Sequence, residues 1–315
     1  MKKTKSAFDT FKEMVIASIK DYLDDSYQDF KLEIKTIKKS GFEYDALLVS
    51  PPEEGTKVVP ALNLNEAYDF YDKNGSFDET MKKLADIRMK NTNLPGFSKE
   101  DIVDFSKIKG KIIPRLINKE ANIEYLSDKP HKDIEDLAVF YAARICESDD
   151  SFGDAIITND LLQLWNINEA ELHDIAMTNL SQRAPLFINI EDALFGGMDK
   201  SSSEIEEIDP DEYNIPYFIL TTQQKTKGAV MAINPSVMNR IIAKFGDVYI
   251  IPSSVDEVLF TKKSNVEDVQ ELVRMVTTVN SSDVRPQDRL SDNIYEYDVE
   301  TQSIKIANNY SAQIA

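Results

Sequence analysis

The last third of the sequence alternates short apolar runs with longer stretches at helical spacing, and this alternation constrains the fold most. Residues 217–221, 228–233 and 248–251 are short, rich in branched and aromatic side chains and bounded by polar residues, which predicts three strands. The Asn-Pro pair at 234–235 is a good helix start, and Gly246 follows the last apolar residue of that helix. Strands and helices mixed in this way predict an α+β fold.

The first two thirds of the chain continue the same mixture. Apolar spacing predicts an amphipathic helix over 8–22, and alternation predicts a hairpin over 30–49, with a third strand near 58–62. Extended segments are also expected at 112–117, 137–145 and 154–158, and near Tyr295 and Ile304. Further helices are predicted from an Asn74-Gly75 stop and from the capping residues Ser76 with Glu79, Ser98, Asn168 with Glu171, and Ser264 with Glu267. We expect mixed or mainly antiparallel sheets with amphipathic helices packed on them, in one domain or two lobes.

A polar segment after the middle of the chain is the best candidate for an internal linker. Residues 201–211, within an acidic loop at 199–213, have the composition of an exposed, mobile segment. A chain of 315 residues also exceeds the usual size of one compact domain. We therefore expect an N-terminal α+β lobe over residues 1–127 and a C-terminal α+β lobe over residues 128–315 that carries the acidic loop.

The charge balance restricts the kinds of partner. The chain has 55 acidic and 36 basic residues, a formal net charge of −19. Such a surplus repels phosphate backbones and anionic lipid, so we expect no direct binding of nucleic acid and favour a basic protein partner. No apolar run approaches the roughly 20 residues that span a bilayer, and Asp9 and Glu13 interrupt a signal-like start. With its single cysteine, Cys146, the chain is expected to be cytoplasmic and not associated with membranes.

Four polar residues directly after the strand at 248–251 are the main catalytic candidates: Ser253, Ser254, Asp256 and Glu257. In α/β proteins, functional side chains often lie at such a position. A serine nucleophile, however, needs a base that takes its proton, usually a histidine held by a carboxylate. The structural alternative is that the serines bind backbone groups while Asp256 or Glu257 begins a turn.

The chain has two histidines that could supply this base. His131 follows Pro130 in a predicted loop, where it could act as a base or cap the segment around Asp133. His173 lies in the middle of a predicted helix beside Leu172, which is typical of a partly buried or surface residue. We therefore regard Ser253, Ser254, Asp256, Glu257 and His131 as candidates and favour none of them as a catalytic residue.

Metal and cofactor sites have little support in the sequence. Acidic pairs are abundant, and no spacing distinguishes one pair from the next. The segment that starts at Asp72 resembles a calcium loop, but Phe77 replaces its turn glycine and Lys83 its bidentate glutamate. The glycines form neither a phosphate-binding loop nor a dinucleotide fingerprint, so we expect no metal and no cofactor.

Three motifs carry a resemblance to a known family. They are Tyr-Phe-Ile-Leu-Thr at 217–221, Gly-Ala at 228–229 and Tyr-Ile-Ile-Pro-Ser-Ser-Val-Asp-Glu-Val at 249–258. With further matches such as Leu-Ser-Asp at 290–292 and Tyr295, the chain resembles over most of its length the bacterial proteins known as domain of unknown function 5688. The resemblance implies no activity, but it implies an accessory of mobile elements. Family members usually carry His-Glu where this chain has Asp-Glu, so any role of that histidine would be lost or altered here.

These observations favour a non-enzymatic, acidic cytoplasmic accessory protein of a mobile element that binds a basic protein. In a sharper form of this hypothesis the acidic face imitates DNA and inhibits a defence nuclease, which would require carboxylates in rows that approximate phosphate positions. The alternative is a hydrolase or metal-dependent enzyme with its site near residues 253–257. A pocket lined by those side chains together with His131 would favour the alternative.

Overall fold

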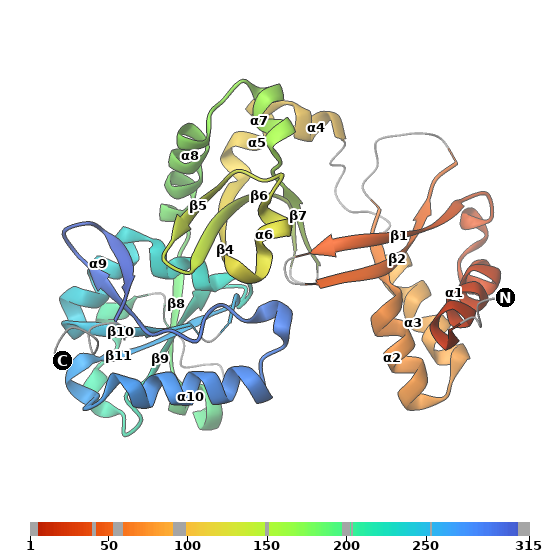
Figure 1. Ribbon diagram of the computed structural model, residues 1–315. Coiled ribbons are helices and arrows are strands. Elements are labelled where there is room, and N and C mark those ends of the chain that lie inside the picture. Colours follow the sequence, from red (N-terminus) through yellow and green to blue (C-terminus); the bar gives the residue numbers. More distant parts are fainter. Residues whose placement is uncertain are drawn as a thin grey trace. The chain divides into compact units, whose positions relative to one another are not determined.

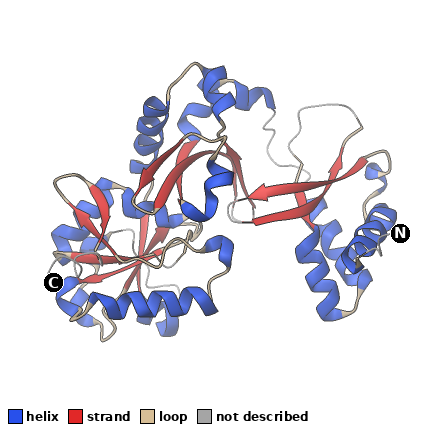
Figure 2. Cartoon of the chain, viewed as in Figure 1, coloured by secondary structure: helices blue, strands red, loops and turns tan. Residues whose placement is uncertain are grey.

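The chain folds into helices and three separate, mostly antiparallel sheets (Figures 1 and 2). A computed structural model describes residues 6–39, 42–52, 59–90, 99–148, 151–196, 202, 204–252 and 254–307. The predicted α+β class is confirmed. Contacts divide the chain into two compact units, Met1–Lys107 with Ile145–Gly153, and Ile108–Arg144 with Asp154–Ala315. Among the described residues, no helix combines the length and the apolar character that crossing a bilayer requires.

The first unit packs helices on a three-stranded sheet. In chain order its elements are α1 (Ala7–Ser18), η1 (Ile19–Tyr22), η2 (Asp25–Tyr27), β1 (Lys31–Lys39), β2 (Phe42–Ser50), β3 (Ala61–Asn63), α2 (Leu64–Asn74), α3 (Phe77–Lys90) and α4 (Lys99–Val103). The predicted hairpin is β1 and β2, and β3 adds to the other side of β2. Phe11, Leu47 and Met81 bring α1, β2 and α3 into one core. The third strand starts at Ala61, later than expected, and the predicted cap Ser98 lies outside the described residues.

The end of α2 follows from local sequence. Gly75 has a left-handed backbone with φ of +67°, which glycine adopts without a steric penalty, and its N–H donates to the Tyr71 carbonyl oxygen. The Ser76 hydroxyl then accepts from the Glu79 N–H at the start of α3. The calcium-like segment is therefore a turn between two helices, as its residue types predicted.

A small sheet opens the second unit. Its strands are β4 (Ile112–Asn118), β5 (His131–Ile134), β6 (Leu137–Ser148) and β7 (Ser151–Ile156), and β6 pairs with the other three. Residues 145–153, at the adjoining ends of β6 and β7, are assigned to the first unit. Between α4 and β5 the chain also forms four short helices: α5 (Phe105–Ile108), η3 (Lys109–Lys111), η4 (Glu120–Asn122) and α6 (Ile123–Leu126). The predicted strand at 137–145 is confirmed, and its residues through Arg144 are buried. Helices α7 (Asn159–Trp165) and α8 (Glu169–Ser181) follow, with α8 packed on β4.

The larger sheet of this unit has six antiparallel strands. Their spatial order is β13 (Ser303–Ile306), β12 (Tyr295–Asp298), β10 (Val248–Ile251), β11 (Val258–Lys262), β9 (Phe218–Thr222) and β8 (Pro185–Asn189). On β11, Phe260 contacts Phe245 of α9 (Pro235–Phe245), while Leu259 packs with the apolar face of α10 (Val269–Ser282). Because successive strand residues point to opposite faces, α9 and α10 cover opposite faces of the sheet (Figure 1).

Two predicted elements differ from those observed. Residues 228–233 were expected to form a strand but form the buried 3-10 helix η9 (Gly228–Ile233). Their first N–H groups donate to the Asp256 and Val255 carbonyl oxygens, so they do not enter a strand ladder. The helix expected after Ser264 begins later, because residues 263–265 form a 3-10 turn and the carboxylate of Asp268 caps α10 by accepting from the Gln270 N–H.

The acidic loop combines exposed acidic residues with two buried isoleucines. Its described part is packed, because Ile205 and Ile208 are buried and Ser202 forms a two-bond bridge with Phe187 of β8. Two 3-10 turns, η7 (Ile205–Glu207) and η8 (Pro210–Glu212), follow this bridge. The acidic residues at 204, 206, 207, 209 and 211 are exposed, as expected, while the two isoleucines between them pack on the core.

Candidate functional site

The loop between β10 and β11 closes on the turn before η9. The Thr221 hydroxyl and the Gly228 N–H both donate to the Asp256 carbonyl oxygen, at 2.6 and 2.9 Å. The Asp256 carboxylate accepts from the Lys227 N–H at 2.8 Å and lies 3.6 Å from the Lys227 ammonium. All three sequence motifs thus contribute to one junction of hydrogen bonds, which we call the 221–228–256 junction.

The neighbouring candidates belong to the same junction. The Ser254 hydroxyl accepts from the Asp256 N–H at 3.1 Å, and the Ser254 N–H donates to the Glu257 carbonyl oxygen at 3.2 Å. Ser253 lies outside the described residues. Ser254 and Asp256 therefore bind backbone groups, and the loop they form joins two strands.

The histidines lie elsewhere in the second unit. His131 begins β5, not a loop, and its Nδ1 is 2.8 Å from the Lys129 carbonyl oxygen. His173 of α8 is half-buried with its Nδ1 2.9 Å from the Tyr141 hydroxyl, and burial lowers the pKa of His173. In the part of the chain that the structure describes, no hydrogen bond or ion pair joins either histidine to the 221–228–256 junction. The same residues contain no cluster of histidine, cysteine and acidic side chains that could hold a metal.

A second polar centre, around Asp136, was not predicted. Its carboxylate accepts from the Ser291 hydroxyl at 2.5 Å, from the Asn293 amide at 3.0 Å and from the Tyr295 hydroxyl. Burial raises the pKa of Tyr295, so this hydroxyl stays protonated and donates. These hydrogen bonds join the β5–β6 turn to the segment before β12. In the sequence, only the family motifs at 290–292 and 295 pointed to these residues.

The sequence of this chain matches a known protein family. The family of unknown function (DUF5688) matches residues 8–299. The chain belongs to this family. Searches of curated proteins and of solved structures found no match. The motifs by which the chain resembles DUF5688 include residues of the 221–228–256 junction and of the polar centre around Asp136. Some motif residues therefore have a structural role.

This DUF5688 chain also buries an ion cluster in its small sheet. The guanidinium of Arg115 on β4 donates two hydrogen bonds to Asp154 Oδ2, at 2.5 and 3.1 Å. Arg144 on β6 places its Nε 3.8 Å from Asp154 Oδ1, and both arginines are about 5% exposed. Asp154 on β7 thus links three neighbouring strands, and no local pattern in the sequence indicated this cluster.

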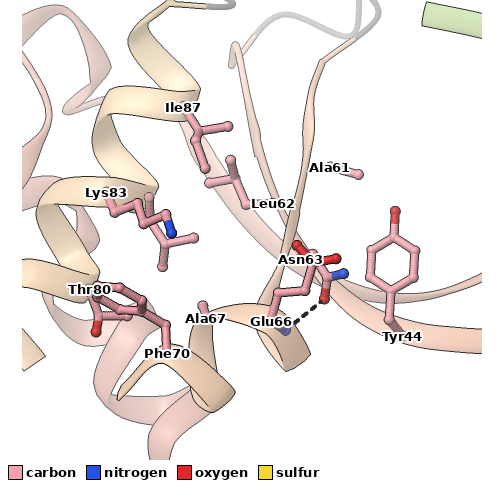
Figure 3. A pocket seen from close by; sticks show the side chains of 11 residues that line it. Tyr44, Ala61, Leu62, Asn63, Glu66, Ala67, Phe70, Thr80, Lys83 and Ile87 are labelled. Atoms are coloured by element: carbon pink, nitrogen blue, oxygen red, sulfur yellow. Dashed lines mark hydrogen bonds between the residues drawn. The ribbon is translucent and has the colours of Figure 1, made fainter. Parts of the chain in front are cut away.

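One cavity lies entirely within the first unit, beside β3 (Figure 3). It has a volume of about 310 Å³ and an apolar floor that includes Leu62, Ala67 and Leu84. Glu66 and Lys83 lie at its rim, and the Lys83 ammonium is 4.4 Å from the centre of the Phe70 ring. The cavity can enclose a small apolar group, and none of the predicted catalytic candidates lines it.

A more open hollow of about 780 Å³ lies between α7 and α8 in the second unit. Amide side chains from Asn159, Gln163 and Asn166 line it, together with Glu169 and Glu171. No basic side chain is part of this lining, so its polar side chains are carboxylates and neutral amides. Its chemistry suits a lysine or arginine side chain better than an anion.

The carboxyl group of Glu257 has a raised pKa because of burial and the nearby charge of Asp256. The folded state then binds this proton more tightly than the unfolded state, so stability falls as pH rises above the ordinary value of 4.5. We expect Glu257→Gln to stabilise the protein at pH 7.5 by less than about 1 kcal/mol, since the side chain is only partly buried. Urea unfolding between pH 4 and 7.5 measures this, and the gain should shrink as pH falls toward 4.5. Glu300→Gln, on an exposed turn, serves as control, and a gain for Glu257→Gln that does not change with pH would contradict the prediction.

Proposed function

We propose that this DUF5688 protein is a non-enzymatic accessory protein that binds a basic protein through an acidic face of its second unit. The main support for this proposal is the acidic stretch, defined as residues 154–212, which has 14 acidic and two basic residues. The second unit as a whole has 32 acidic and 19 basic residues, a net charge of −13, against −6 for the first unit. A surface with a predominantly negative electrostatic potential attracts a positively charged partner and speeds up association with it.

Packing gathers distant parts of the acidic stretch around one helix. Both α8 and the turn η7 pack against α9. The open hollow of α7 and α8 adds Glu169, and its lining contains no basic side chain. The carboxylates of Asp160, Glu169 and Glu212 are exposed and make no ion pair among the described residues. They are therefore available to lysine and arginine side chains of a partner.

Other acids of the stretch are already neutralised. Arg240 of α9 pairs with Glu204 and Glu206, both at 2.6 Å, and holds the pKa of Glu206 at about 2. Lys262 lies 3.3 Å from Asp211. These pairs interrupt any row of free carboxylates, so imitation of DNA has less support than recognition of a basic protein surface. The hydrolase alternative is not favoured, because Ser254 and Asp256 bind backbone groups. The proposed setting in the cytoplasm, with a mobile element, rests on the sequence alone.

Removing the available charges tests the proposal. In the triple variant Asp160→Asn, Glu169→Gln, Glu212→Gln the protein loses three charges from the acidic stretch without losing an ion pair. A pull-down of the tagged full chain from cells of its own host is expected to recover a basic protein with the wild type, and at least about fivefold less with the triple variant. Recovery should also fall at high salt, because exposed charges are screened.

The matched control removes three exposed charges of the second unit outside the stretch. The triple variant Glu120→Gln, Glu267→Gln, Glu300→Gln has the same net charge and is expected to recover the partner as the wild type does. Equal recovery by both triple variants would contradict the proposal, as would recovery of no protein or of a partner whose binding does not depend on salt.

A further inference from the structure

Two large apolar side chains are exposed side by side in the acidic stretch. Phe195 is 81% exposed and Leu194 is 65% exposed, in the single π-helical turn η5 (Asp192–Gly196) that follows β8. Phe195 is the most exposed large apolar residue in the described part of the chain. Adjacent apolar side chains presented to water in this way are typical of interaction sites.

The turn that presents them is fixed by polar contacts of low exposure. Asn189, which is buried, accepts from the Glu191 N–H at 2.7 Å and donates to the Ile215 carbonyl oxygen at 3.1 Å. The buried Asp192 accepts from the Tyr213 hydroxyl at 2.8 Å, and the Glu191 carboxylate accepts from the Ile215 N–H. The backbone on the N-terminal side of the apolar pair is therefore held in place. This lowers the conformational entropy that is lost when the pair is buried by a partner.

The surroundings of the pair are acidic. The backbone of Ser202 forms hydrogen bonds with that of Phe187 on β8, and the Tyr213 hydroxyl donates to Asp192 at the start of η5. Residues 204–212 lie between these two attachment points. Glu204, Glu206 and Asp211 pair with Arg240 and Lys262, whereas Glu207, Asp209 and Glu212 are exposed and make no ion pair among the described residues. An apolar pair in the same stretch as these carboxylates complements an apolar surface bordered by lysine and arginine.

We infer that Leu194 and Phe195 are the apolar anchor of the acidic face, and that they pack on an apolar surface bordered by basic side chains on the partner. This inference rests on the proposed function. A second copy of the chain is a poorer occupant, because two acidic faces repel each other. An anionic lipid surface is repelled for the same reason. Anchors of this kind carry most of the binding energy of an interface, while the charges around them set specificity and association rate.

Synthetic peptides provide a defined probe. The first is a helical peptide of leucine and lysine with all leucines on one face. The second replaces every leucine by serine, and the third replaces every lysine by glutamine. By fluorescence anisotropy with the full chain, we expect the first to bind most tightly. Phe195→Ser is expected to weaken its binding about tenfold. The melting temperature should not change, since the side chain is exposed.

The control is Ile123→Ser on α6, which removes a side chain that is 67% exposed outside the acidic stretch. It is expected to change affinity less than twofold. If Phe195→Ser binds the first peptide as the wild type does, while the triple variant of the acidic stretch binds it weakly, the anchor is overturned and the proposed function stands. If no peptide binds, or if the triple variant binds as well as the wild type, both fail. A dimer in sedimentation that Phe195→Ser abolishes would overturn the basic partner in favour of a second copy.

Discussion

Replacing Asp154 by alanine is expected to destabilise the second unit by about 4 kcal/mol. The substitution removes the carboxylate that accepts two hydrogen bonds from Arg115 and that faces Arg144 at 3.8 Å. Both guanidinium groups are buried, and burial already lowers the pKa of Arg115. Two positive charges would then remain in a region of low polarity without this carboxylate, which is far more costly than the loss of an exposed ion pair.

Equilibrium unfolding in urea, followed by far-ultraviolet circular dichroism, measures this loss. The matched control is Asp133→Ala, because Asp133 forms an exposed pair with Lys119 at 2.6 Å on the same sheet. That variant is expected to lose less than about 1 kcal/mol. A loss below about 1 kcal/mol for Asp154→Ala, equal to the control, would show that the buried cluster does not stabilise the fold.

The second large effect is expected for Gly228→Ala, with a loss of about 3 kcal/mol. An added Cβ would lie 2.2 Å from the Thr221 hydroxyl oxygen, 2.6 Å from the Thr222 backbone nitrogen and 2.7 Å from the Asp256 carbonyl oxygen. Two of these atoms belong to the backbone of β9 and of the β10–β11 loop, so they cannot rotate away. The junction must therefore open, and the hydrogen bonds of Gly228 and Thr221 to Asp256 weaken with it.

Two further variants separate this cause from a general effect of alanine. Gly110→Ala adds a Cβ where nothing lies within 4 Å, and it is expected to change stability by less than about 0.5 kcal/mol. Thr221→Ala combined with Gly228→Ala removes the one side-chain clash but neither backbone clash, so it should not restore stability. Thermal unfolding of the three variants decides the matter, and a melting temperature of Gly228→Ala equal to that of Gly110→Ala would contradict the close approach.

Several elements were predictable because their signals are local. The helix α9 begins where the Asn234 side chain accepts from the Ser236 N–H, and it ends at Gly246, whose φ is +74°. The start of α8 has the reciprocal capping box of Asn168 and Glu171 that its sequence indicated. Each of these interactions joins residues at most a few positions apart, so the residue types themselves predict it.

The sequence predicted where the candidate residues 254–257 lie, but not which groups they bind. Residues 254–257 do lie at the end of a strand, where the sequence placed them. Their function in the fold depends on Thr221, Lys227 and Gly228, which lie about 30 residues earlier and carry no sign of that partnership. The same long-range bonds turned the expected strand at 228–233 into a 3-10 helix.

The α+β class, most strands and helices, and the acidic surplus follow from the amino-acid sequence, since composition, periodicity and caps depend on near neighbours. Which polar side chains meet depends on the packed fold. Asp136 reaches Tyr295, and Arg115 reaches Asp154, across long stretches of chain. The exposure of Phe195 is likewise a property of the packed fold, because an apolar residue in a sequence is normally expected to be buried. Contacts between distant residues arise from the packing of whole elements, and no short pattern encodes them.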